Sequence, residues 1–115
     1  MITINNNIIT MTKGDSVSFT LPLLIGKEIN TEPVDLSNVE KIEFNIIAPF
    51  QQSDFALVKI EYVPNNVDEY GNLNVSLSSE DTEDLDTGKY YYEVKLVGNN
   101  EINTIIPRRL FYIIN

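Results

Sequence analysis

The chain has 115 residues, of which 43% are hydrophobic, and a formal charge of −9. That length suits one domain, residues 1–115, and the negative charge repels nucleic-acid phosphates and anionic lipid headgroups, so we expect no nucleic acid and no membrane as a partner. Histidine and cysteine are both absent, which excludes thiol and imidazole nucleophiles, a Ser-His-Asp triad and ordinary zinc sites.

Apolar and polar residues alternate along most of the chain, and a period of two predicts half-buried strands. Residues 2–11 predict one strand or two short pieces with asparagines between them, and Lys13 to Ser16 predict a turn. In the next strand, Pro22 cannot donate to a ladder, which indicates an edge or a bulge there. One face of that strand collects the apolar residues Val17, Phe19, Leu21 and Leu23.

A polar loop follows, within which Val34 and Leu36 are spaced to pack beneath the loop as plugs. Three further alternating segments, residues 41–46, 56–63 and 72–78, each predict a strand with one apolar face. Turn-forming residues separate them, including Pro49 and the stretch "PNNVDEYGN".

Residues 79–86 are the one place where a helix is predicted, with Ser79 as cap and acidic residues in the first turn. Gly88 stops this helix after about two turns. A tyrosine-rich strand follows, then a hairpin loop over Gly98 to Glu101, and a final strand over residues 102–114 that we expect to bend at Pro107.

About seven strands with regularly spaced turns and a single short helical turn predict an all-β fold. We expect an antiparallel β-sandwich, immunoglobulin-like in general form. A small barrel is the alternative, because a period of two does not distinguish closed sheets from open ones.

The acidic run from Glu80 to Asp86 is a candidate calcium site, since carboxylate oxygens suit a hard cation. The spacing of Asp84, Asp86 and Gly88 does not match the EF-hand loop, in which acids stand at positions one, three and five and glycine at six. A solvated helical turn is the favoured interpretation.

Tyr90, Tyr91 and Tyr92 stand together, but neighbouring residues of a strand face opposite sides. We therefore expect Tyr90 and Tyr92 in the core, or as a tyrosine corner that bonds to the upstream backbone. Tyr91 is expected on the other face, as an exposed partner contact.

No catalytic, cofactor or metal site is predicted, and we expect a protein that is not an enzyme. A pair of carboxylates suited to a glycosidase is almost inevitable among 17 acids and carries little information. The five glycines stand singly at turns, so no phosphate-binding loop is present. Arg108 and Arg109, the only paired positive charges, suit either docking to an acidic partner or internal charge balance.

Several segments together resemble a known family: "KGDSVSFTL", then "PVDLSNVEKIEFNI", then "GNLNVSLSSEDTEDLDTGKYYYEVKL". They are similar to the small immunoglobulin-like domains of tailed bacteriophages, as in the N-terminal domain of the upper baseplate protein of phages infecting Gram-positive bacteria. The family pattern L-x-x-G-x-Y-x-Y-x-V-x-L is matched without a break by Leu85, Gly88, Tyr90, Tyr92, Val94 and Leu96. The resemblance spans roughly Lys13 to Leu96. Upper baseplate proteins continue into a long helical or receptor-binding region, whereas the sequence here ends at Asn115.

The resemblance implies a virion structural protein, assembled in the bacterial host cytoplasm. Its partners are then other virion proteins of the tail, baseplate or head, contacted through sheet edges and loops, with repeated copies or a homo-oligomer in a symmetric assembly. The absence of cysteine and of a signal-peptide pattern in "MITINNNIITMTKGD" suits synthesis in a reducing cytoplasm. No apolar run approaches the ~20 residues of a membrane helix.

The apolar chain ends, "MITINNNIITM" and "LFYIIN", are further candidate contacts, among them Phe111. The alternative is that they are ordinary first and last strands paired within the sandwich.

Two other functions fit the same fold. One is a capsid decoration protein, and the other is a carbohydrate-binding module with Tyr91, Tyr70 or Phe50 as a stacking surface. The absence of tryptophan, the largest stacking side chain, counts against the carbohydrate module.

Overall fold

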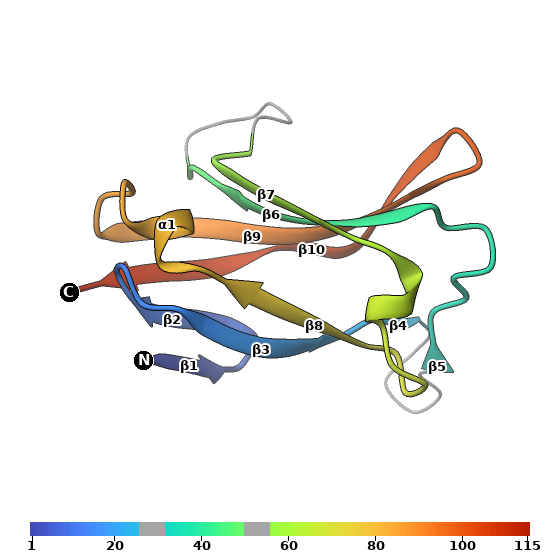
Figure 1. Cartoon of the computed structure of the whole chain (residues 1–115), viewed down its shortest axis with the longest axis horizontal. Helices are drawn as coiled ribbons and strands as arrows, with labels where there is room; N and C mark the ends of the chain where they lie inside the picture. Colours follow the sequence, from blue (N-terminus) through green and yellow to red (C-terminus); the bar gives the residue numbers. More distant parts are fainter. Residues whose placement is uncertain (26–31, 50–55) are drawn as a thin grey trace.

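A computed structural model of the chain describes residues 1–25, 32–49 and 56–115. The fold is an all-β sandwich of the immunoglobulin type, as predicted (Figure 1). The larger sheet has the strand order β1-β2-β10-β9-β6-β7. In chain order its strands are β1 (Ile2–Asn5), β2 (Ile8–Thr12), β6 (Lys41–Ile47), β7 (Val58–Tyr62), β9 (Gly88–Gly98) and β10 (Glu101–Ile114).

The opposing layer is smaller. It consists of the pairs β3-β8 and β4-β5. The remaining elements are β3 (Val17–Pro22), β4 (Leu24–Ile25), β5 (Glu32–Pro33), η1 (Pro64–Asn66), β8 (Asn72–Leu77) and α1 (Ser79–Thr82). Compared with the immunoglobulin scheme, β6, β9 and β10 take the places of strands C, F and G, and β3 and β8 take those of B and E. Within the described ranges no strand pairs with β3 or β8 on their outer sides.

One pair in the larger sheet departs from the predicted antiparallel arrangement. β2 runs parallel to β10, with Ile9 opposite Phe111 and Met11 opposite Ile113. The parallel pair joins the first and last parts of the chain, so the whole domain serves as the crossover that such a pair requires. The chain ends therefore lie within the sheet, which confirms the alternative expected for the two apolar ends.

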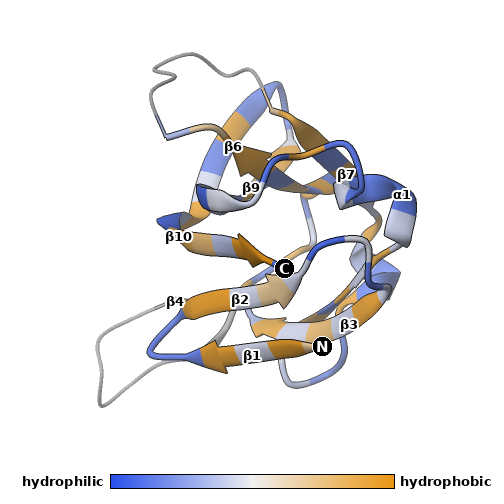
Figure 2. Cartoon of the chain, turned by 90° about the vertical axis from the view of Figure 1, so that its left-hand side faces the viewer, coloured by the Kyte–Doolittle hydropathy of each residue, from blue (hydrophilic) through white to orange (hydrophobic). Residues whose placement is uncertain are grey.

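The predicted apolar faces meet in a single core between the layers. Figure 2 shows apolar residues recurring along the strands of both layers. Val34 and Leu36 pack against the core from the loop before β6, as predicted for plugs. The fully buried side chains of largest volume are Tyr92, Phe44, Phe111, Ile9, Met11, Leu23, Ile42, Ile46, Ile47, Leu73, Leu77 and Ile113.

Two asparagine pairs form the tight hairpins of the larger sheet. Asn6 and Asn7 connect β1 to β2, and Asn99 and Asn100 connect β9 to β10, all four with φ between 51° and 67°. Two-residue loops with positive φ at both positions match the right-handed twist of the strands they join, and asparagine tolerates that conformation. The predicted bend of the last strand is confirmed, because the β9-β10 register shifts between Thr104 and Arg109, on either side of Ile106.

The predicted helix is shorter than expected and begins one residue earlier. α1 is a single turn, and its cap is Ser78 rather than Ser79. Asp81 accepts hydrogen bonds from the Ser78 backbone N–H at 2.7 Å and from the Ser78 hydroxyl at 3.2 Å. The Leu85 N–H donates to the carbonyl of Thr82 at 3.0 Å, so the chain turns instead of continuing the helix.

Gly98 is required by a close approach of two backbones. A Cβ atom there would overlap the carbonyl oxygen of Asn38 and lie 3.0 Å from Cα of Val39. We expect Gly98→Ala to lower the free energy of unfolding by about 2 kcal/mol or more, because both obstacles are main-chain atoms. Urea unfolding followed by circular dichroism measures this loss.

Gly14→Asn is the matched control for this substitution. Nothing lies within 4 Å of a Cβ at Gly14, and its φ of 79° is one that asparagine accepts. We expect a change within about 0.5 kcal/mol there. Equal stability of the two variants would contradict the close approach at Gly98.

Candidate interaction surface

The motif residues Leu85, Gly88, Tyr90 and Tyr92 shape the turn into β9 and the centre of the core. Gly88 has φ of 149°, where a side chain is strained, and Leu85 packs against the core. The Tyr90 hydroxyl donates to the carbonyl oxygen of Asp86 at 2.7 Å. This bond to the backbone a few residues upstream is the tyrosine corner that the sequence predicted.

Tyr92 is the central side chain of the core. Its ring stacks on Phe44 with centroids 6.0 Å apart and meets Phe111 edge-on at 6.3 Å. Its hydroxyl donates to the carbonyl oxygen of Asn7 at 2.7 Å, which ties the first hairpin to the middle of β9. Burial raises the pKa of the Tyr92 hydroxyl, and a hydrogen bond with Arg109 opposes that rise.

The four expected partner contacts do not share one surface. Tyr91 is half-buried on the outer face of the larger sheet, where the Lys89 ammonium lies 5.6 Å from its ring centroid. Arg108 is exposed, whereas Arg109 is half-buried beside Tyr92 and takes part in internal polar contacts. Phe111 is a correction: it has no exposed surface, because the parallel pairing with β2 turns its ring into the core.

A concave region of about 720 Å³ lies beside Tyr91, with Pro49, Leu57 and Lys89 in its wall. Leu57 is among the exposed large hydrophobic residues of the structure. This depression therefore offers apolar surface, and its lining also includes one acidic residue, Asp86, and one basic residue, Lys89.

The proposed stacking residues are not brought together. Tyr70, which is 69% exposed, lies in the turn before β8, whereas Tyr91 lies near the start of β9. β8 runs the length of the sandwich between these two points, so they are at opposite ends (Figure 1). Phe50 lies outside the described residues. Tyr70 and Tyr91 therefore do not form one platform.

Charged side chains form a ladder across the outer face of β6 and β7. Glu43 and Glu61 are directly opposite each other, an arrangement that is unfavourable alone. The Lys41 ammonium lies 2.6 Å from Glu61 and 3.5 Å from Glu43, and Lys59 lies 3.8 Å from Glu43. The hydrogen bond from Lys41 lowers the pKa of Glu61, and the same bond raises the pKa of Lys41. This bond favours the ionised form of the Glu61 carboxylate at neutral pH.

Two polar residues next to this ladder are buried, Glu93 at 5% exposure and Asn45 at 4%. They are directly opposite each other on β9 and β6. The Glu93 carboxylate lies 3.9 Å from the Lys95 ammonium. The Asn45 Oδ1 atom has no hydrogen-bond partner within the part of the chain that the structure describes.

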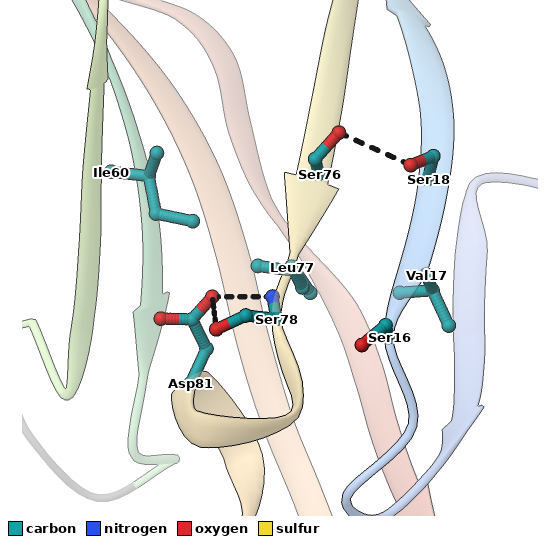
Figure 3. A pocket seen from close by; sticks show the side chains of 8 residues that line it. All are labelled: Ser16, Val17, Ser18, Ile60, Ser76, Leu77, Ser78 and Asp81. Atoms are coloured by element: carbon teal, nitrogen blue, oxygen red, sulfur yellow. Dashed lines mark hydrogen bonds between the residues drawn. The ribbon is translucent and has the colours of Figure 1, made fainter.

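A second depression, of about 520 Å³, lies between β7 and the pair β3-β8 (Figure 3). The hydroxyl groups of Ser18 and Ser76, on the paired strands β3 and β8, are 3.1 Å apart in its wall, and Asp81 also lines it. The Asp81 carboxylate accepts two bonds from Ser78, so it serves to cap α1. The hydroxyl groups of Ser18, Ser76 and Ser78 thus have structural partners in the fold.

The described part of the acidic run does not gather into a metal site. No group of three or more carboxylates suited to a metal ion occurs among residues 1–25, 32–49 and 56–115. In the same residues, no helix has the length and apolar character needed to span a membrane.

No family model matches the chain, and no curated protein matches it at a significant level.

Removing the Tyr92 hydroxyl removes its hydrogen bonds with Asn7 and Arg109 together. We expect Tyr92→Phe to lower the free energy of unfolding by about 1–2 kcal/mol, because the ring contacts remain while the hydrogen bonds of the hydroxyl are lost. Tyr92→Ala, which also empties the core, should cost about 3–5 kcal/mol. Chemical denaturation of both variants gives the comparison, and equal losses would refute a separate contribution from the hydroxyl.

Burial also raises the pKa of the Tyr90 hydroxyl, and the nearby Asp86 carboxylate adds to the rise. Because their pKa values are raised, the hydroxyl groups of Tyr90 and Tyr92 bind their protons more tightly in the folded protein than in the unfolded chain. Their stabilising contribution is therefore complete below the unfolded pKa of about 10 and is lost as the pH rises through the folded values.

We expect the free energy of unfolding to fall above about pH 10 and to fall less steeply in Tyr90→Phe. Denaturant titrations at a series of alkaline pH values measure these slopes. Tyr70→Phe, which changes an exposed tyrosine, is the control and should leave the slope unchanged. Parallel slopes for all three proteins would contradict the raised pKa of Tyr90.

Proposed function

We propose that the chain is a bacteriophage virion structural protein, a small sandwich module of the tail or baseplate that binds neighbouring virion proteins. The observation that carries this proposal is the unbroken L-x-x-G-x-Y-x-Y-x-V-x-L stretch from Leu85 to Leu96. Each of its positions has a structural part in the fold: a turn at Gly88, a tyrosine corner at Tyr90 and a core anchor at Tyr92.

The surface features support binding to another protein more than catalysis. The two depressions next to Tyr91 and next to Ser76 are open, and the carboxylate at the second is used as a helix cap. The strand edges, in contrast, offer backbone groups to a neighbouring protein, which is a common mode of recognition between proteins.

Two alternative functions differ from this proposal, one in the location of the protein within the virion and the other in the ligand that it binds. A capsid decoration protein would have the same fold and the same kind of contacts. A carbohydrate-binding module is disfavoured, because Tyr70 and Tyr91 lie at opposite ends of the sandwich.

Mass spectrometry of density-purified particles, from the phage or lysogen that encodes the chain, tests the proposal. We expect the chain at a fixed copy number relative to the major tail protein, and in isolated tails instead of isolated heads. Enrichment in heads would favour the decoration protein. A chain that never sediments with particles would overturn the virion proposal, and a glycan array then tests the carbohydrate alternative.

A further inference from the structure

The far half of the β9-β10 hairpin extends past the strands that flank it. Figure 1 shows this hairpin reaching beyond the body of the sandwich, at the end opposite α1 and the C-terminus. β2 pairs with β10 only from Phe111 to Ile114. Within the described residues, no strand therefore pairs with β10 from Glu101 to Leu110 on its side away from β9.

The hydrogen-bond pattern shows which groups of this edge are open. The carbonyl of Val97 accepts from the N–H of Glu40 at 2.8 Å, so the backbone groups of Val97 point away from β10. Ile102 stands opposite Val97, and in an antiparallel pair both residues then point outward. Thr104, two residues further and opposite Lys95, points the same way. Ile102 and Thr104 thus present N–H and C=O groups to the open side of β10.

Two other edges of the sandwich, those of β8 and β7, are protected. Along β8, the N–H groups of Asn72, Ser76 and Ser78 donate to Asp68, the Tyr62 hydroxyl and Asp81 at 2.7–3.1 Å. The edge strand β7 carries Lys59 and Glu61, and charges on an edge discourage pairing. In the part of the chain that the structure describes, the Ile102–Ile106 segment of β10 carries neither charged residues nor side-chain caps on its outward N–H groups, and Pro107, which lacks an N–H, ends it.

A groove of about 340 Å³ runs beneath this open edge. Val34 and Val39 from the β5-β6 loop, with Leu96 and Ile105 from the hairpin, supply its apolar surface, and Asp35 and Glu101 stand at its rim. The described lining includes no lysine or arginine. The Ser37 N–H donates to Asp35 at 2.9 Å and lowers the pKa of that carboxyl, so it is charged at neutral pH. The groove therefore suits an apolar side chain flanked by positive charge.

We propose that the open edge at Ile102 and Thr104, with the groove beneath it, receives an extended segment of a neighbouring virion protein that alternates apolar and basic residues. This rests on the proposed function and names how the module docks. Backbone bonds to Ile102 and Thr104 supply affinity, while side chains that enter the groove supply specificity. A second copy of the chain is a poorer occupant, because two molecules of charge −9 repel each other.

The probes are short synthetic peptides with the same number of residues as the segment 101–106 of β10. In one set, valine, isoleucine or leucine alternates with lysine or arginine. In a matched set, glutamate replaces lysine and arginine. We expect members of the basic set to bind at least about tenfold more tightly than their acidic counterparts by fluorescence anisotropy. Asp35→Asn with Glu101→Gln should weaken that binding about fivefold.

Hydrogen exchange identifies the mode of binding. The outward amides of Ile102 and Thr104 should exchange quickly in the free protein and slowly with a bound peptide. The amide of Asn103, which faces Leu96 on β9, should be protected in both states. Thr104→Pro removes one outward N–H and should weaken binding about tenfold, whereas Thr104→Ser should bind like the unchanged protein.

Three results would overturn the proposal: no binding from either set, equal binding of both sets, or binding that leaves the Ile102 and Thr104 amides unprotected. Concentration-dependent protection of those amides without peptide would make a second copy the occupant and overturn the choice of partner. The particle analysis is independent, so a chain found in virions that binds no peptide would retain the function and lose this docking mode.

Discussion

The bond from the Tyr92 hydroxyl to the carbonyl of Asn7 holds together parts of the chain that lie 85 positions apart. β9, which carries Tyr92, is paired with β6 on one side and with β10 on the other. The Tyr92 ring fills the space between Phe44 and Phe111, and the hydroxyl fixes the first hairpin beside β10. The parallel β2-β10 pair and the position of the chain ends depend on this arrangement.

The edges of the sandwich are treated in different ways, and this difference concentrates the docking potential of the molecule. Side chains accept hydrogen bonds from the N–H groups of Asn72, Ser76 and Ser78 along β8, and charged residues lie on β7. The Ile102–Ile106 stretch of β10 lacks such protection, although open edges invite unwanted pairing. The protein is proposed to assemble with others, and a neighbouring protein that covers this edge would explain why it is unprotected.

Several of the acidic side chains behind the −9 charge have structural roles in the fold. The ladder around Lys41 neutralises carboxylates that would otherwise repel each other on the outer sheet face. Asp81 is used as a helix cap and Asp68 binds the N–H groups of Tyr70 and Asn72. These four carboxylates therefore stabilise turns and strands, and the carboxylates at the rim of the hairpin groove are among those left for a partner.

The sequence by itself determined the sandwich, the apolar faces of β3, β6, β8 and β9, the tyrosine corner and the bend near Pro107, because alternation and turn residues act over a few neighbouring positions. It did not determine that Phe111 is buried, that Ser78 caps α1, or that β2 joins β10 in parallel. Those outcomes depend on contacts between distant segments. The open edge at Ile102 and Thr104 was likewise decided by tertiary structure, since it exists only because β2 ends its pairing at Phe111.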